Sequence, residues 1–231
     1  MMRKGATRMA NKSGGKVLRF GKAAIFAHWA MAINFFILAL TGLLIYVDFF
    51  DFLAPLFGGI QGARLIHRVS AVGFIVLPLL ALFANFKGFL EWMSYLVKWG
   101  KDDWGFLKAF PKEFFGGHVE VPPQDKFNAG EKINSIVQLV GCVTLAITGL
   151  ILWFPESFSQ GVLQIALPLH TGAFVLTFTA FIGHCFLATI HPATKDALPG
   201  IINGYVDEEF AKSHYPKWYA KISKNNQGSK G

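Results

Sequence analysis

The sequence has few charged residues, and its long apolar stretches contain no acidic residue. Of the 231 residues, 16% are charged and 53% are hydrophobic, far more apolar than an average soluble domain. Four runs, each near or above the ~20 residues that cross a bilayer as a helix, contain no Asp or Glu: roughly residues 23–47, 65–86, 133–154 and 163–190. The sequence therefore predicts an all-α membrane protein, a four-transmembrane-helix bundle, with no carboxylate relay through it.

Cysteine is almost absent. Cys142 and Cys185 fall inside the third and fourth runs, so neither a disulfide framework nor a cysteine-based metal loop is predicted. The first run also lacks a small-residue cleavage pattern at its end, so we expect a retained helix and not a signal peptide.

Basic residues lie on one side of the predicted bundle. Seven precede the first run, seven lie between the second and third, six follow the fourth, and only Arg64 and Arg68 fall in the other two connections. By the positive-inside rule, both termini are predicted to be cytoplasmic. This topology accounts for the net charge of +8, so the charge does not indicate nucleic-acid binding.

The chain is predicted to be one domain, residues 19–220, between mobile tails at residues 1–18 and 221–231. Tryptophans alternate with lysines in residues 89–110, which indicates an interfacial amphipathic segment between the second and third helices. ALTGLLIY at residues 39–46 resembles AITGLILW at 146–153. The match suggests two related hairpins, although membrane composition alone also explains it.

Four histidines fall within the predicted helices. His170 and His184 are fourteen residues apart, close to four helical turns, so they share one face about 21 Å apart. A single such imidazole is more often a helix contact, but two in register indicate a functional site. The topology pairs His67 with His170 near the outer face and His28 with His184 near the inner face.

These pairs predict two b hemes with histidine as both axial ligands. Zinc needs three or four ligands at one point, whereas heme iron needs two axial ligands and an apolar slot. With both axial positions closed, electron transfer is favoured over oxygen activation. Glycines either line the slot or pack helices together: Gly42, Gly73, Gly141, Gly149, Gly172 and Gly183.

Three further residues near these pairs are candidates. Arg64 and Arg68 flank His67 and are predicted to bind heme propionates, although anchoring to lipid headgroups would explain them equally well. His191 follows the last helix, where a role at the helix end is the default and quinone protonation is the alternative.

The chain resembles the cytochrome b556 (gamma) subunit of membrane-bound formate dehydrogenases, a family of di-heme b-type cytochromes. The resemblance rests on His28 with Trp29, on the His170 to His184 interval, and on three short motifs: RLIH at 64–67, FNAGEK at 127–132 and HYPKWY at 214–219. It covers most of residues 20–222, but not the central loop at 87–126. It implies heme ligation by His67 with His170 and by His28 with His184, which agrees with the topological pairing.

The same resemblance implies a quinone pocket at Asn128, Ala129 and Gly130, beside the cytoplasmic heme. The family usually has glutamine next, where this chain has Glu131. An amide and a carboxyl at the start of the third helix could hydrogen-bond a quinone carbonyl and relay protons. Alternatively, Asn128 and Glu131 form a capping box that begins the helix.

We therefore expect a multi-pass protein of the bacterial cytoplasmic (inner) membrane. The resemblance implies electron transfer from an iron–sulfur subunit and a molybdenum or tungsten formate dehydrogenase catalytic subunit to menaquinone or ubiquinone. The chain has no ligand set for oxidising formate itself. The alternatives are a b-type cytochrome subunit of another respiratory oxidoreductase, such as a hydrogenase or a thiosulfate reductase, and a heme-free membrane transporter.

Overall fold

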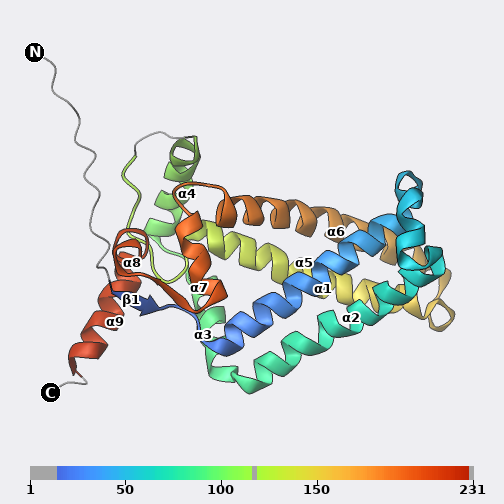
Figure 1. Cartoon of the computed structure of the whole chain (residues 1–231), viewed down its shortest axis with the longest axis horizontal. Coiled ribbons are helices and arrows are strands. Elements are labelled where there is room, and N and C mark those ends of the chain that lie inside the picture. Colours follow the sequence, from blue (N-terminus) through green and yellow to red (C-terminus); the bar gives the residue numbers. More distant parts are fainter. Residues whose placement is uncertain (1–14, 116–118, 229–231) are drawn as a thin grey trace, which may run out of the picture.

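Four long helices dominate the structure, a computed structural model that describes residues 15–115 and 119–228 (Figure 1). They are α1 (Lys22–Tyr46), α2 (Gly59–Ala84), α5 (Ala129–Trp153) and α6 (Gln160–Thr189). All four are long and apolar enough to cross a membrane. Each overlaps one of the predicted runs, so the predicted four-helix bundle is confirmed.

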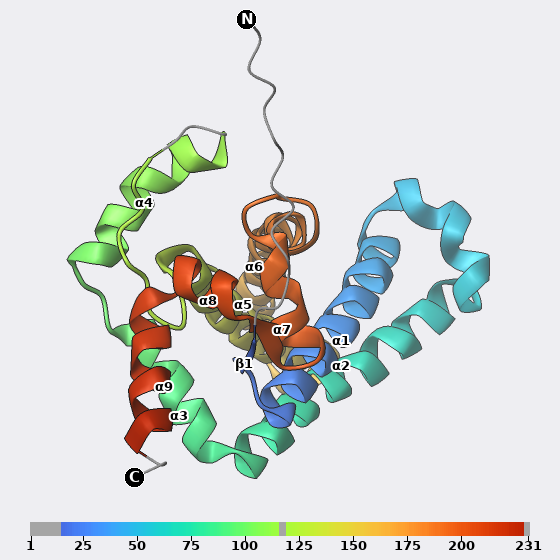
Figure 2. The ribbon, with the colours of Figure 1, turned by 60° about the vertical axis from the view of Figure 1, so that its left-hand side comes forward.

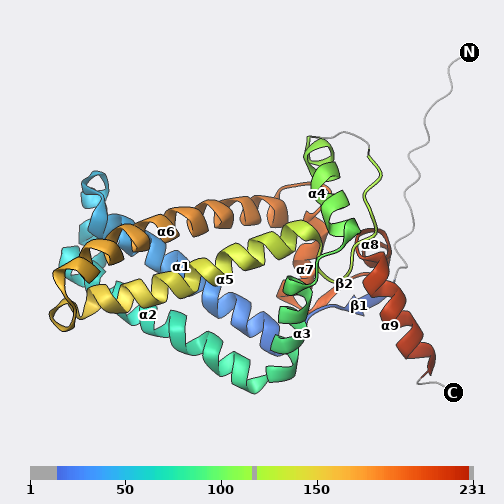
Figure 3. The ribbon, with the colours of Figure 1, turned by 180° about the vertical axis from the view of Figure 1, so that it is seen from behind.

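The long helices form two antiparallel hairpins. The 3-10 helix η1 (Asp48–Phe57) joins α1 to α2, and the shorter η2 (Pro155–Ser157) joins α5 to α6 (Figure 3). Gly58 and Gly59 have φ angles of 76° and 78°, in the left-handed region where glycine is favoured, so the chain can turn sharply into α2. We call the end with η1 and η2 the outer end and the opposite end the inner end.

Large apolar side chains cover the outside of the bundle. Val69, Phe83 and Ile165 are more than 60% exposed, an arrangement suited to lipid and unfavourable in water. The buried centre is small and aromatic, because Phe35 of α1, Phe74 of α2 and Cys142 of α5 pack there against Phe181 of α6. Close packing of buried groups, and not exclusion of apolar surface from water, therefore holds the helices together within the bilayer.

Shorter elements gather at the inner end (Figure 2). They are β1 (Lys16–Leu18), α3 (Phe86–Val97), α4 (Lys101–Phe114), η3 (Lys195–Ala197), α7 (Leu198–Ile202), β2 (Tyr205–Asp207), α8 (Glu208–His214) and α9 (Pro216–Gly228). The predicted interfacial segment forms α3 and α4, and the Trp99 and Trp104 rings pack 5.5 Å apart where the two helices meet. α9 lies beside α3, with Lys221 Nζ 5.8 Å from the centre of the Tyr95 ring.

Regular elements lie within both segments that are predicted to be tails. Residues 16–18 form β1, which pairs antiparallel with β2 so that Val17 lies opposite Val206. At the other end α9 extends to Gly228, well past the predicted boundary at residue 221. Composition misses both elements because their partners are distant in sequence. The rest of each predicted tail, residues 1–14 and 229–231, lies outside the described residues.

Candidate functional site

The His67 imidazole is held by a threonine on the neighbouring helix. Its Nδ1 lies 2.9 Å from Thr41 Oγ1, and Thr41 is fully buried. The Thr41 hydroxyl donates its only proton to the Ile37 carbonyl, 2.8 Å away. With the proton on Nδ1, the imidazole donates to Oγ1, and Nε2 of His67 then carries the lone pair that can bind a metal.

The second hairpin repeats this arrangement. His170 Nδ1 lies 2.9 Å from Thr148 Oγ1, and the Thr148 hydroxyl donates to the Thr144 carbonyl at 2.6 Å. Each threonine is followed by a glycine, and a Cβ on Gly42 or Gly149 would lie 3.4 or 3.3 Å from Cε1 of the adjacent histidine. The Thr-Gly pair shared by the two similar segments therefore has one structural role, to seat a histidine.

His28 of α1 and His184 of α6 face each other at the inner end. Their ring centroids are 6.2 Å apart and the rings are inclined at 61°. His28 Nδ1 is buried and has no hydrogen-bond partner among the described residues, whereas His184 is exposed. The helices thus bring together two imidazoles from opposite hairpins.

An aromatic layer lies between the outer and inner pairs. Phe35 lies 6.4 Å from Phe74 and 5.3 Å from Phe181 between ring centroids. Each of these residues lies between the two histidine levels along its helix. Within the described residues no three His, Cys, Asp or Glu side chains converge as a metal site, and the pairing of His67 with His170 stays a prediction.

The six candidate glycines fall into three groups. Gly42 and Gly149 contact the outer histidines, as described above. Gly73 and Gly141 instead allow helices to approach closely, because an added Cβ would lie 2.8 Å from Asn34 Oδ1 or 2.1 Å from Thr177 Cγ2. Gly172 and Gly183 of α6 face open space. The slot role therefore suits Gly42, Gly149, Gly172 and Gly183.

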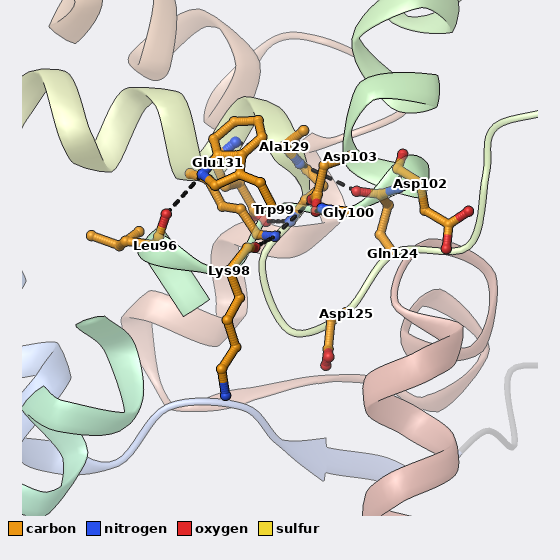
Figure 4. Close-up of polar contacts among 12 residues, drawn as sticks. Leu96, Lys98, Trp99, Gly100, Asp102, Asp103, Gln124, Asp125, Ala129 and Glu131 are labelled. Carbon is orange, nitrogen blue, oxygen red and sulfur yellow. Dashed lines mark hydrogen bonds and ion pairs between the residues drawn. The ribbon is translucent and has the colours of Figure 1, made fainter. Parts of the chain in front are cut away.

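The start of α5 is a complete capping box. Asn128 Oδ1 accepts from Glu131 N at 2.9 Å, and Glu131 Oε2 accepts from Asn128 N at 2.8 Å. Gly130 lies between them. Nearby, Gln124 Oε1 accepts from Ala129 N at 3.2 Å (Figure 4). The capping interpretation is thus confirmed, and it leaves the amide NH₂ of Asn128 able to donate to a ligand.

Sequence reasoning missed two partners of Glu131. Arg19 and Tyr215 each donate to Glu131 Oε1 at 2.9 Å. Burial opposes the charge on Arg19, but Glu131 and Tyr215 together outweigh it, so the pKa of Arg19 is raised. Burial also raises the pKa of Tyr215. Tyr215 lies in the HYPKWY motif, whereas nothing in the sequence distinguished Arg19 from other N-terminal cations.

His191 lies at the end of α6. It is buried, stacks on Phe114 of α4 with ring centroids 5.2 Å apart, and has Nδ1 3.3 Å from Thr194 Oγ1. Thr194 in turn donates to the Leu187 carbonyl at 2.5 Å. These contacts fit the predicted role at the helix end.

Residues 19–204 match the model of one protein family, prokaryotic cytochrome b561. The chain belongs to this family. The match contains both hairpins and all four paired histidines. It confirms a membrane cytochrome with b-type heme, spanning the bacterial inner membrane several times.

Relatives of this cytochrome are subunits of formate dehydrogenases. The formate dehydrogenase cytochrome b556 subunit of Haemophilus influenzae is 30% identical over 208 residues, covering 88% of this chain and 82% of the relative. The nitrate-inducible cytochrome b556(Fdn) subunit of Escherichia coli is 28% identical, covering 85% and 87%. The cytochrome b556(fdo) subunit of the same organism is 27% identical, covering 91% and 95%. The resemblance inferred from sequence is confirmed.

The residues of this cytochrome fit a b-type heme. Two metal–nitrogen bonds of about 2 Å, with the ring half-widths on either side, place the imidazole centroids about 6 Å apart, close to the 6.2 Å between His28 and His184. The unpartnered Nδ1 of His28 and the open faces of Gly172 and Gly183 suit the same group. In the outer histidines, a proton on Nδ1 leaves Nε2 as the ligand atom.

The two outer arginines of the cytochrome do not lie in a loop, because α2 begins at Gly59 and contains both. The prediction assigned both to a connection, but its boundary at residue 65 leaves only Arg64 outside the second run. Arg64 and Arg68 are exposed, and Arg68 Cζ lies 5.6 Å from the centre of the Trp153 ring. Both are within a turn of His67 along the helix.

Proposed function

We propose that this cytochrome is the membrane anchor and electron-transfer subunit of a formate dehydrogenase. In this proposal it holds two bis-histidine b hemes and passes electrons from an iron–sulfur partner to menaquinone or ubiquinone. The observation that carries it is the facing of His28 and His184 across 6.2 Å. The names of the similar H. influenzae and E. coli subunits support formate dehydrogenase as the parent complex.

The protein's role in this chemistry is to bind the hemes and to keep water away from the space between them. A bis-histidine heme supplies one-electron transfer without an open iron position for oxygen. His67 with His170, and His28 with His184, would be the axial ligands. Phe35, whose ring packs within 6.4 Å of the Phe74 ring, belongs to the aromatic layer that keeps water out between the two levels. Arg64 and Arg68 would contact propionates at the outer level.

The proposed quinone contact is at the inner end, at the start of α5. The amide NH₂ of Asn128 would donate to a quinone carbonyl beside Gly130, while its Oδ1 caps the helix. Glu131 would act by holding Asn128 in place, because both of its carboxylate oxygens already accept hydrogen bonds. The helix end near His191 is the proposed source of quinone protons.

The inner end would face the cytoplasm. Among the described residues, cations before α1, between α2 and α5, and after α6 lie at this end. The catalytic and iron–sulfur partners would then dock at the outer end. Moving each electron inward across 100 mV of membrane potential is worth about 2.3 kcal/mol, which makes the arrangement able to conserve energy.

The test is to purify the complex from membranes and measure its heme content and activity. We expect two b hemes per chain, a reduced spectrum with a b-type α band, co-purification of a formate dehydrogenase catalytic subunit, and formate-driven quinone reduction. One heme per chain would contradict the two paired sites. Co-purification with a hydrogenase or a thiosulfate reductase would keep the heme sites but replace the parent enzyme.

A further inference from the structure

The outer and inner histidine pairs differ in what their Nδ1 atoms contact. Both outer imidazoles, His67 and His170, are hydrogen-bonded at 2.9 Å to buried threonine hydroxyls. At the inner level, Nδ1 of His28 is buried and has no hydrogen-bond partner within residues 15–115 and 119–228. The proposed outer heme thus has two axial ligands whose Nδ1 atoms are hydrogen-bonded to threonine. At the proposed inner heme, His28 has no such bond in the part of the chain that the structure describes.

We propose that Thr41 and Thr148 are positioning residues that lower the reduction potential of the outer heme relative to the inner heme. The inference deepens the proposed function and rests on it. An acceptor on Nδ1–H makes the ligating nitrogen a stronger electron donor, which stabilises oxidised iron. With threonines on both axial ligands, the two effects act on one iron.

An imidazole that binds iron through Nε2 carries its proton on Nδ1, so both threonine oxygens act as acceptors toward their histidines. Each hydroxyl gives its proton to a carbonyl of its own helix, at 2.8 Å for Thr41 and 2.6 Å for Thr148. Donating in this way polarises the oxygen and strengthens the bond that it accepts. The adjacent glycines leave no side chain that could push either imidazole away from its threonine.

The nearest cations act in the opposite direction but are more weakly coupled. Arg64 and Arg68 would favour reduced iron by their charge. Both are exposed, where water, ions and headgroups screen them. Thr41 and Thr148 are 0% and 4% exposed, so their hydrogen bonds act in a low-dielectric interior. The carboxylate of Glu131 acts on the inner His184 and would lower the inner potential, but its charge is paired with Arg19. The hydrogen bonds therefore set the order, and electrons pass downhill from the outer to the inner heme.

The test is a redox titration of the purified complex, followed through the α bands of the two hemes. Thr41→Val and Thr148→Val keep the side-chain shape and remove the hydroxyl. We expect each variant to shift the reduction equilibrium of the outer heme about tenfold towards the reduced form. This shift equals a rise of about 59 mV in its reduction potential, because the couple transfers one electron. The reduction potential of the inner heme should not change, so the difference between the two potentials becomes smaller.

Matched variants separate the hydrogen bond from packing. Thr41→Ser keeps the hydroxyl and should restore most of the original potential. Thr179→Val is the control, because Thr179 also donates to the carbonyl four residues back, at 2.8 Å, but is exposed. It should leave both potentials unchanged.

A second measurement does not depend on the threonine variants retaining heme. His67→Ala removes an outer ligand, and we expect the heme that remains to be the one of higher potential in the unmodified protein. A remaining heme of lower potential overturns the inference, as does a Thr41→Val Thr148→Val double variant with unchanged potentials. Fewer than two hemes in the unmodified protein would instead overturn the proposed function itself.

Discussion

Arg19 and Glu131 form an ion pair with a nitrogen–oxygen distance of 2.9 Å, although 112 residues separate them in the chain. Arg19 precedes α1, Glu131 lies in the first turn of α5, and Tyr215 of the C-terminal segment donates to the same carboxylate oxygen. One carboxylate thus joins three distant parts of the chain at the inner end.

Neutralising this carboxylate is expected to destabilise the protein. Glu131→Gln leaves the buried guanidinium of Arg19 without its counter-charge. We expect a loss of about 2 kcal/mol, less than the 3–5 kcal/mol typical when one partner of a fully buried pair is removed, because the Glu131 side chain is 32% exposed. Thermal unfolding in detergent measures the change as a lower Tm.

The control for that experiment is Glu91→Gln. Glu91 pairs with Lys126 at 3.1 Å, but its side chain is 52% exposed, and such pairs contribute little. Its Tm should stay near that of the unmodified protein. Equal effects of the two substitutions would mean that the Arg19 pair has no special structural role.

Asn128 offers a substitution that separates capping from ligand binding. Asn128→Asp keeps an oxygen that accepts from Glu131 N, and aspartate is as good an N-cap as asparagine, but it removes the NH₂ donor. We expect the Tm to be retained and kcat/KM for quinone to fall about tenfold, the equivalent of one hydrogen bond. Steady-state quinone reduction at constant heme content measures it.

Asn85→Asp is the matched control, since Asn85 caps α3 by accepting from Gly88 N at 3.1 Å. It should leave quinone kinetics unchanged. Normal kinetics in Asn128→Asp would return Asn128 to the capping role alone.

Removing one histidine of a pair should remove only one heme. His170→Ala is expected to abolish the outer heme and leave the inner spectrum, whereas His184→Ala should do the reverse. The reason is that the aromatic layer around Phe35 and Phe181 separates the two levels. Heme quantification and low-temperature spectra measure the outcome. Equal loss of both hemes from either variant would contradict the pairing.

Acidification is expected to loosen α9. Hydrogen bonds from Lys212 and Tyr219 hold the pKa of Glu208 below its ordinary value of 4.5. A carboxylate with a depressed pKa contributes its stability above the ordinary value, and the contribution is lost as pH falls through the folded pKa. Limited proteolysis within α9 should therefore increase as the pH falls below 4.5, through the lowered pKa of Glu208. Glu208→Gln should show the faster cleavage already at neutral pH. Cleavage that changes neither with pH nor with this substitution would mean that the Glu208 contacts do not hold α9 in place.

The membrane helices and histidine levels could be predicted from the sequence because they depend on local properties. A run of apolar residues has to form a helix in lipid, since every backbone polar group must be satisfied within the segment. A fourteen-residue interval places His170 and His184 on one face whatever surrounds them. Alternating helix direction then brings His67 to the level of His170.

Only the tertiary structure decided which side chains support those histidines and which close the inner end. The contact between Thr41 and His67 depends on how α1 and α2 are rotated about their axes, and sequence periodicity does not determine that rotation between two apolar helices. The contact between Arg19 and Glu131 depends on the N-terminal strand, α5 and the C-terminal segment meeting in space. Such contacts join residues far apart in sequence, so they become visible only when the chain is folded.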